Sequence, residues 1–238
     1  MIDYSKLFHP QSIVVIGASN SREKLGGIVM NNLSKSYSGK IYPVNPNGGI
    51  IFDILSFKTL NILPVIPELA IIALNANLSV KALKEAGQMQ IPFAIIFAGG
   101  FSEIGEKELE NQLVDICKET GIKLIGPNCM GVWNSHRLNA SFMNILPPFH
   151  GKITFISQSG SLIAYAIYLK LRLGKFVSLG NSTDVNFEDF FDYLSSDSDT
   201  KVLALYIESL KNGRNFLEKL KNFPKPVIAI KAGSSDIG

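Results

Sequence analysis

The chain has 238 residues, of which 46% are hydrophobic and 18% are charged, and its formal net charge is +3. This length accommodates one large or two small domains, and the apolar content excludes a disordered chain. The basic residues are dispersed, which argues against nucleic-acid binding, and the apolar runs are too short to span a membrane. Because the N-terminal segment also lacks an apolar signal core, we expect a cytoplasmic protein.

Short apolar runs alternate with helical patterns through the first half of the chain. This order is typical of right-handed βαβ units on a parallel sheet that is covered on both faces. We therefore expect residues 1–126 to form one doubly wound α/β domain, with 48–67 as a loop that holds one short helix. The expected strands are 12–16, 40–44, 69–74, 93–97 and 123–125, and the expected helices are 25–36, 78–88 and 105–120.

Residues 127–150 interrupt the alternation and carry Pro127, Pro147 and Pro148, which predicts a connection. A second, smaller doubly wound parallel unit follows over 151–238. Its last strand leads into a Gly/Ser loop without a covering helix, so we expect this domain to be incomplete at its C-terminus. The expected strands are 152–156, 176–178, 202–207 and 227–231, and the expected helices are 162–172, 187–195 and 214–222.

The strand at 12–16 ends in a small-residue turn, Gly17-Ala18-Ser19, just before a helical pattern. Such a turn places backbone N–H groups at a helix N-terminus, where a phosphate or pyrophosphate is stabilised. The turn lacks the glycine spacing of dinucleotide-binding proteins, and Asn45 stands where a nicotinamide site needs an acid for the ribose. These features indicate a nucleotide-like ligand other than a nicotinamide cofactor, and coenzyme A fits them.

The serine-rich turn at 157–161 follows the strand at 152–156 and opens the next expected helix. Its hydroxyl and N–H groups predict a second anion site of the same kind. The alternative is an ordinary capped turn, because Ser is a favoured N-cap residue. Glu208 ends the strand at 202–207, at the edge where open α/β sheets place their sites. An acid there can orient an imidazole or can simply be solvated, and the residues alone leave both readings open.

Two further small-residue loops, at 99–103 and 126–131, follow strands and are expected at the same edge as Gly17. Together they can line an extended ligand such as the pantetheine arm of coenzyme A. We expect Cys129 to be a packing residue, because no His–acid pair accompanies it. The spacing of Cys117 and Cys129 is not that of metal ligands, so no metal site is expected.

An ordered series of short motifs covers essentially the whole chain. The series resembles the α-subunit, or α-like half, of the nucleoside-diphosphate-forming acyl-CoA synthetases, in the ADP-forming acetyl-CoA synthetase branch of the succinyl-CoA synthetase superfamily. The motifs are FHPQS (8–12), YPVNP (42–46), AGGFSE (98–103), GPNCMG (126–131), NASF (139–142), SQSG (157–160), SLGN (178–181) and YIE (206–208).

The resemblance implies a Rossmann-like CoA-binding domain followed by a flavodoxin-like ligase domain. In the second domain it implies phosphate binding by Ser157, Ser159, Gly160 and Ser161, with Ser159 and Glu208 in catalysis and Glu208 orienting a phosphohistidine. The residues implied for coenzyme A are Gly17, Ala18, Ser19, Asn20, Asn45, Pro46, Asn47, Phe97, Ala98, Gly99, Asn128 and Cys129.

The implied reaction converts acyl-CoA, ADP and phosphate into an acid, coenzyme A and ATP, and its substrate is a small carboxylic acid. ATP, ADP and Mg²⁺ are expected on an ATP-grasp β-subunit or fused β-domain, in a hetero- or homo-oligomer. Family members often carry Lys where Asn47-Gly48 stands, and their histidine lies beyond the equivalent of Lys231–Ser234, outside this chain. We therefore expect these residues alone to be inactive, whether as a truncation, a split gene product or a degenerate paralogue. The alternative function is a non-catalytic CoA- or acyl-CoA-binding module.

Overall fold

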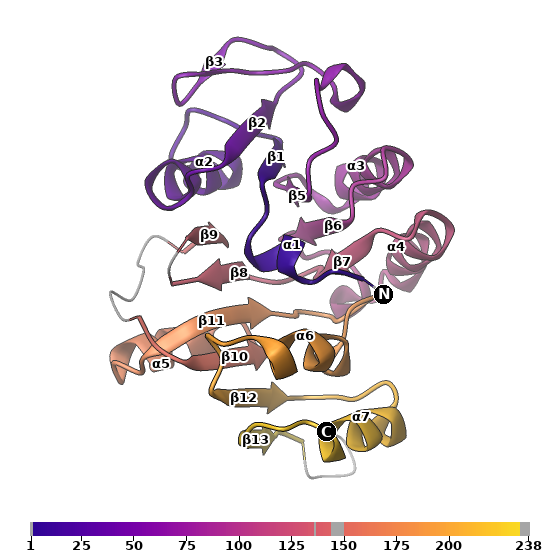
Figure 1. The fold of residues 1–238 in the computed structure, drawn as a ribbon. Coiled ribbons are helices and arrows are strands. Elements are labelled where there is room, and N and C mark those ends of the chain that lie inside the picture. Colours follow the sequence, from indigo (N-terminus) through magenta and orange to yellow (C-terminus); the bar gives the residue numbers. More distant parts are fainter. Residues whose placement is uncertain (1, 136, 144–149, 234–238) are drawn as a thin grey trace.

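The computed structural model describes residues 2–135, 137–143 and 150–233, which form two large sheets, one above the other in Figure 1, and one small two-stranded sheet. The first sheet is parallel and has the strand order β2-β1-β5-β6-β7. Its central strands are buried over their whole length, as parallel strands covered on both faces must be. The strands are β1 (Ser12–Ile16), β2 (Lys40–Val44), β5 (Leu69–Ile72), β6 (Phe93–Ile96) and β7 (Lys123–Ile125).

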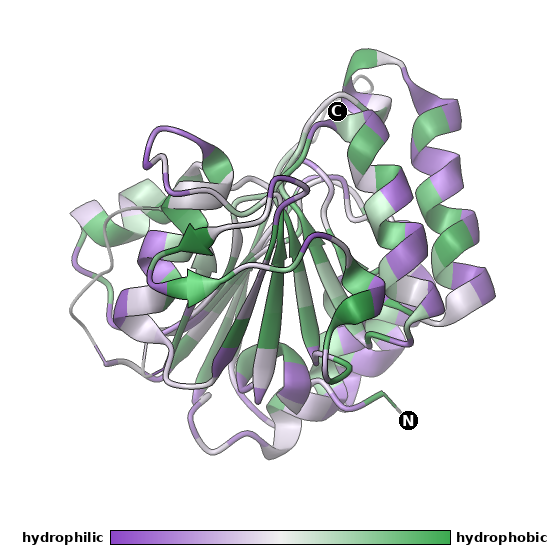
Figure 2. Ribbon diagram, turned by 90° about the horizontal axis from the view of Figure 1, so that it is seen from above, coloured by the Kyte–Doolittle hydropathy of each residue, from purple (hydrophilic) through white to green (hydrophobic). Residues whose placement is uncertain are grey.

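Helices cover both faces of the first sheet, which confirms the doubly wound domain. In β1, Ile13 and Val15 share a core with helix α2 (Leu25–Ser36). The alternate residues of β1 share a core with α3 (Ala76–Gln88) and α4 (Lys107–Thr120), on the opposite side of the sheet (Figure 1). In Figure 2 the strands are accordingly hydrophobic, and the flanking helices carry both hydrophobic and hydrophilic residues. The strand order reverses between β1 and β5, where doubly wound sheets bind their ligands.

Several short elements of the first domain lie outside the expected pattern. Helix α1 (Ser5–Phe8) precedes β1, and the segment expected as loop and helix also contains a hairpin. A 3-10 turn, η2 (Ser102–Ile104), comes before α4. The remaining elements of the loop segment are β3 (Ile50–Ile51), β4 (Ile54–Leu55) and η1 (Leu60–Ile62).

The second sheet has the order β13-β12-β10-β11-β8-β9. Its first four strands are parallel, as expected. The expected connection was wrong in one respect, because its described part contains β8 and β9, and β8 runs antiparallel to β11. The second sheet is therefore mixed. The strands are β8 (Gly131–Asn134), β9 (Leu138–Ser141), β10 (Ile153–Ser157), β11 (Leu173–Ser178), β12 (Val202–Ile207) and β13 (Val227–Lys231).

The helix expected at 162–172 is shorter in the structure, where α5 spans Leu162–Tyr168. The carbonyls of Leu173 and Gly174 instead accept hydrogen bonds from Gly151 and Ser135, so sheet pairing draws this segment into β11. Tertiary pairing thus overrides local helix propensity. The other helices are η3 (Phe187–Phe190), α6 (Phe191–Ser196) and α7 (Gly213–Lys221).

One face of the second sheet is only partly covered. Leu203, Leu205 and Ile207 of β12 pack in the main core, whereas the alternate residues point to the other side. There Ile228 and Ile230 of β13 are 63% and 62% exposed. We call this surface the open face. It borders a cavity of about 350 Å³ whose lining includes Phe155, Leu162, Tyr165, Leu169, Ala204, Tyr206, Ile228 and Ile230.

The N-terminal segment joins the two domains through aromatic contacts. The ring of Tyr4 lies 5.3 Å from that of Phe93 in the first sheet and 5.1 Å from that of Phe190 in the second domain. Phe8 stacks on Tyr193 at 5.2 Å. Within the described residues, no helix combines the length and the apolar character needed to cross a bilayer.

Candidate functional site

The motif loops lie side by side at the carboxyl ends of neighbouring parallel strands. We call this series of loops the row. The N–H of Asn128, after β7, donates to the carbonyl of Ala98, after β6, at 2.8 Å. The N–H of Met130 donates to Ser178 Oγ at the end of β11, at 3.0 Å. The row therefore continues from the first sheet into the second.

The turn after β1 differs from its expected role in one respect. The N–H groups of Gly17 and Ala18 both donate to the carbonyl of Val44, at 3.1 and 3.2 Å. The side chain of Asn45 in turn donates to the carbonyl of Ala18 at 2.8 Å. These two amides are thus occupied by the β2 strand end, and the expectation that they face an anion was wrong.

Helix α2 begins at Leu25, as the sequence pattern predicts, so residues 19–24 separate it from the turn after β1. Its first turn nevertheless packs against the loop. A Cβ atom placed on Gly26 would lie only 1.9 Å from the carbonyl oxygen of Gly17, so only glycine permits this approach. The N-terminus of α2 therefore reaches the sheet edge by way of an excursion at 19–24.

The polar side chains of the first loops hold the loops together. Asn20 donates to the carbonyl of Ile50 at 2.7 Å and accepts the N–H of Phe52 at 2.9 Å, which ties the turn to the β3–β4 hairpin. Asn45 Oδ1 accepts the N–H of Asn47 at 2.9 Å. Ser19 Oγ accepts a local N–H in the same way. These residues shape the edge through their backbone positions.

A cavity of about 300 Å³ opens at the switch point between β1, β2 and β5, and Gly17 and Pro46 line it. Lys58 and Lys81, which sequence reasoning missed, also line it. The Cε atom of Lys58 lies 3.3 Å from where a Cβ on Gly48 would be, so the Lys58 side chain runs beside Gly48. The other lining residues are Ile16, Val44, Thr59, Leu60, Leu74, Leu78, Ala82 and Glu85.

Two residues expected to contact coenzyme A have buried side chains. Phe97 packs edge-to-face on Phe142, with ring centroids 5.5 Å apart. Cys129 donates its S–H to the carbonyl of Ile96 at 3.3 Å, and burial raises the pKa of its thiol to about 12. A neutral buried thiol is no nucleophile, in agreement with the expected packing role. Asn128 and Gly99, in contrast, remain at the surface of the row.

In the second domain the switch point lies between β10 and β12. Ser157 is buried and its hydroxyl donates to the carbonyl of Ser159 at 2.6 Å, whereas the hydroxyls of Ser159 and Ser161 lie 3.1 Å apart nearer the surface. Gly160 packs on Met130, since an added Cβ would lie 2.5 Å from its Cγ. The serine turn thus adjoins the Asn128–Met130 loop.

Glu208 is exposed at the end of β12, and Gln158, which sequence reasoning did not single out, fixes its backbone. The Oε1 atom of Gln158 accepts the N–H groups of Glu208 and Ser209 at 2.6 and 2.9 Å. The N–H of Gln158 donates to the carbonyl of Tyr206. Gln158 belongs to the SQSG motif, so the sequence marked its position. The sequence could not show that its buried amide joins the ends of β10 and β12.

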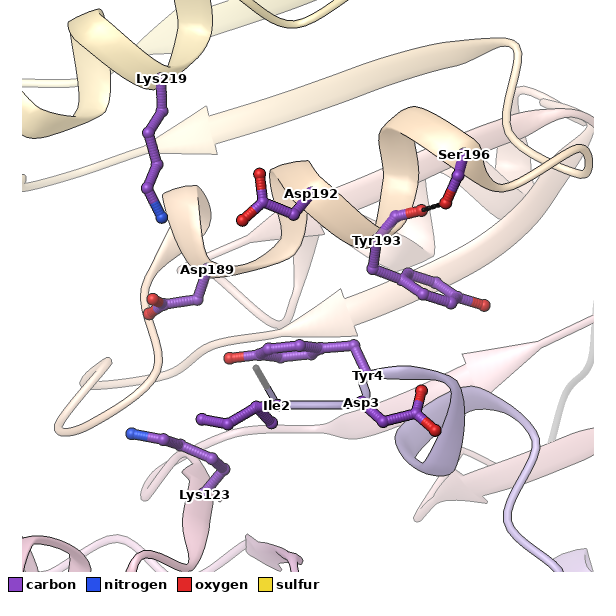
Figure 3. A pocket seen from close by; sticks show the side chains of 9 residues that line it. All are labelled: Ile2, Asp3, Tyr4, Lys123, Asp189, Asp192, Tyr193, Ser196 and Lys219. Atoms are coloured by element: carbon purple, nitrogen blue, oxygen red, sulfur yellow. Dashed lines mark hydrogen bonds between the residues drawn. The ribbon is translucent and has the colours of Figure 1, made fainter.

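A larger cavity, of about 510 Å³, lies away from this row (Figure 3). Tyr4 and Lys123 lie on one side of it, and Asp189 and Lys219 lie on the other. Lys123 pairs with Asp184 at 3.3 Å, and Lys219 donates to a backbone carbonyl. None of the residues expected to bind coenzyme A or phosphate lines this cavity. Among the described residues, no cluster of three or more His, Cys, Asp or Glu could hold a metal ion.

Two family models match the chain. The CoA binding domain matches residues 11–135, and the succinyl-CoA ligase like flavodoxin domain matches residues 150–238. The order of the two matches agrees with the two domains of the structure.

Curated relatives match over the whole chain. It is 40% identical to the acetate–CoA ligase [ADP-forming] II subunit alpha of Pyrococcus furiosus, over 100% of this chain and 53% of that protein. It is also 40% identical to the acetate–CoA ligase [ADP-forming] of Methanocaldococcus jannaschii, over 97% of this chain and 33% of that protein. The chain thus spans about half, or less, of the length of these relatives.

A solved structure also matches. The dinucleotide forming acetyl-coenzyme A synthetase 1 of Ca. Korarchaeum cryptofilum, in complex with phosphate and ADP, superimposes with a TM-score of 0.93 at 31% identity. The match covers 100% of this chain and 53% of that chain. Two domains of these families, in this order, also make up the matched part of these CoA ligase relatives. The chain belongs to the ADP-forming acyl-CoA synthetase family.

Proposed function

We propose that this chain is the CoA-binding, α-type portion of an ADP-forming acyl-CoA synthetase. The assembly would convert acyl-CoA, ADP and phosphate into an acid, coenzyme A and ATP. The observation that carries the proposal is the continuous row of loops from the cavity beside Gly17, past Asn128, to the serine turn at 157–161. Such a row can hold an extended ligand at one end and its reacting group near an anion site at the other.

Coenzyme A would occupy the first-sheet end of the row. The cavity offers apolar side chains for an adenine ring, and Lys58 and Lys81 for phosphate groups, which fits the chemistry of the ligand. Glu85 also lines the cavity, so the two lysines would have to outweigh one carboxylate. The arm of the ligand would pass Gly99 and Asn128 at the surface of the row.

The second-domain end would hold the phosphoryl group. Ser159, Gly160 and Ser161 offer hydroxyl and N–H donors, and Glu208 offers a carboxylate that can orient an imidazole. The histidine would take the phosphoryl group from an acyl phosphate and pass it to ADP, and it would lie in polypeptide outside these residues. ADP, ATP and Mg²⁺ would bind to an ATP-grasp partner, and the substrate would be a small carboxylic acid. We propose a cytoplasmic location for the assembly.

A second candidate is a non-catalytic CoA- or acyl-CoA-binding module, which the CoA binding domain match over residues 11–135 and the cavity beside Gly17 support by themselves. The two candidates share coenzyme A binding and differ only in phosphoryl transfer. Incubating the native assembly with labelled ATP separates them, because only the ligase forms an acid-labile phosphohistidine.

Calorimetric titration of the 238-residue chain with coenzyme A tests the shared step. Binding is expected, and each of Lys58→Ala and Lys81→Ala should weaken it about tenfold through loss of a phosphate contact. Lys84→Ala is the matched control, because Lys84 lies on the same helix as Lys81 but does not line the cavity. The proposal would be overturned if the chain showed no binding of coenzyme A and bound NADH or NADPH tightly.

A further inference from the structure

The loop after β11 is paired with the end of β7, which joins the two domains at the row. The N–H groups of Asn181 and Thr183 donate to the carbonyls of Pro127 and Gly126, at 3.0 and 3.2 Å. The N–H of Leu124 donates to Asp184 at 3.0 Å. The backbone of Asn181 is therefore fixed relative to the first domain, and its side chain has a defined direction.

The Asn181 side chain meets two carboxylates of the first domain. Its Nδ2 donates to Glu103 Oε2 at 2.7 Å and to Glu110 Oε2 at 2.9 Å. Its Oδ1 accepts from the Asn128 side chain at 3.3 Å. A carboxamide provides two N–H donors and an acceptor, so one residue satisfies all three neighbours. An aspartate of the same shape would have no donor for either carboxylate.

Both carboxylates in turn hold the loop after β6. Glu103 Oε1 accepts the N–H groups of Gly100 and Phe101 at 2.5 and 3.2 Å. Glu110 accepts the N–H of Ser102 at 3.1 Å and the hydroxyl of Thr183 at 2.8 Å. Burial alone would raise the pKa of these carboxyl groups, but the hydrogen bonds outweigh it and lower both values. The carboxylates therefore act as ionised acceptors at neutral pH.

The same cluster contains two residues of the proposed coenzyme A site. A Cβ placed on Gly99 would lie 3.0 Å from Glu103 Oε1 and 3.4 Å from Asn128 Oδ1. Gly99 thus lies against the Glu103 carboxylate and the Asn128 amide, and Asn181 forms hydrogen bonds with both of these groups. Asn181 belongs to the second domain. Its substitution would therefore displace Gly99 and Asn128, which are proposed to line the ligand arm in the first domain.

We propose that Asn181 is a positioning residue, which sets the 98–103 loop and Asn128 for coenzyme A through Glu103 and Glu110. This inference rests on the proposed function. Under this inference, the affinity for coenzyme A depends on the contact between the two domains. Asn181 itself is not one of the proposed binding residues. If Asn181 only joined the domains, its substitution would change the free energy of unfolding but not the affinity for coenzyme A.

The test compares Asn181→Asp with Lys123→Ala in the 238-residue chain. Lys123→Ala is the matched control, because it removes an ion pair between the domains but leaves the bond from the Leu124 N–H to Asp184 and every bond of Asn181, Glu103 and Glu110 in place. Coenzyme A affinity is measured by calorimetry, and amide hydrogen exchange is measured at Gly100 and Phe101. Asn181→Asp should weaken binding about tenfold and accelerate exchange at both amides, because three carboxylates then face one another. Lys123→Ala should alter neither.

A second variant distinguishes positioning from general damage. Adding Glu103→Gln to Asn181→Asp restores a donor opposite the new carboxylate, and should recover most of the lost affinity and of the slow exchange. Unchanged affinity and exchange in Asn181→Asp, or equal losses in Lys123→Ala, would overturn the inference. If the unaltered chain binds no coenzyme A, the proposed function fails, and the exchange rates alone then decide whether Asn181 positions the loop.

Discussion

The side chain of Gln158, at the end of β10, accepts the backbone N–H of Glu208, at the end of β12, with an N–O distance of 2.6 Å. The same amide accepts the N–H of Ser209 and donates to its carbonyl at 3.0 Å. Gln158 is only 9% exposed, so these bonds are sheltered from water. One buried side chain therefore fixes the backbone that carries the exposed carboxylate proposed to orient the histidine.

Replacing Gln158 by Ala is expected to destabilise the chain by about 1–3 kcal/mol, because two N–H groups lose their acceptor. Urea unfolding measures the change. Gln112→Ala is the matched control, since Gln112 is exposed on α4, and it should alter the free energy of unfolding by less than about 0.5 kcal/mol. Equal unfolding curves for the two variants would contradict the role assigned to the Gln158 amide.

Gly26 provides a second test, at the contact between α2 and the turn after β1. Gly26→Ala places a methyl group 1.9 Å from the Gly17 carbonyl oxygen, so the helix must move away from the loop. We expect a loss of about 1–3 kcal/mol and weaker coenzyme A binding. The measurements are thermal unfolding and calorimetry.

Gly213→Ala is the control for this substitution. A Cβ there meets nothing within 4 Å, so the variant should be neutral or stabilised by about 0.4–1 kcal/mol. If Gly26→Ala unfolds at the same temperature as Gly213→Ala, then the close approach of α2 does not shape the site.

The first domain could be predicted well because its signals are local. The strand at 12–16 is a continuous apolar run, and the helix at 25–36 has boundaries that the sequence pattern gives directly. The strands β8 and β9 could not be predicted in this way. They are only four residues long and contain Asn134 and Asn139. β8 becomes a strand by pairing with β11, and β9 becomes one by pairing with β8.

The site shows the same division between local and distant signals. Gly17 and Glu208 follow strands, and strand ends can be located from the sequence. The occupation of the Gly17 amide by the carbonyl of Val44 depends on two strands meeting, and so does the arrival of Lys58 beside Gly48. Such contacts join residues in different elements, and no local pattern encodes them.

The buried pair of Lys175 and Asp197 predicts a pH dependence of stability. Lys175 is 1% exposed, and its Nζ lies 2.7 Å from Asp197 Oδ2, which also accepts the hydroxyl of Thr200. Burial would raise the pKa of Asp197, but these hydrogen bonds outweigh it and lower the pKa below the ordinary 3.8. A depressed carboxyl pKa contributes stability above the unfolded value, and this contribution is lost as the pH falls below about 4.

Asp197→Asn leaves Lys175 buried without its counter-charge and should cost about 3–5 kcal/mol at pH 7. Urea unfolding at pH 7 and at pH 3.5 measures both effects, and the difference between the two pH values should shrink in the variant. Asp192→Asn, an exposed carboxylate on α6, is the control. An equal pH dependence in all three proteins would show that another group causes the acid loss.

The open face predicts self-association of the isolated chain. Ile228 and Ile230 lie opposite Ala204 and Tyr206 in the register of β13 and β12, so the four side chains form one apolar surface beside α5. Exposed apolar surface of this kind, on the outermost strand of a sheet, favours association between copies. Ile230→Lys should therefore reduce light scattering at high concentration with a stability change under about 1 kcal/mol. Leu217→Lys, on α7 and also exposed, should leave the scattering unchanged. Equal scattering by the unaltered chain and Ile230→Lys would exclude the open face as the cause of association, because a lysine at this position disrupts an apolar contact made there.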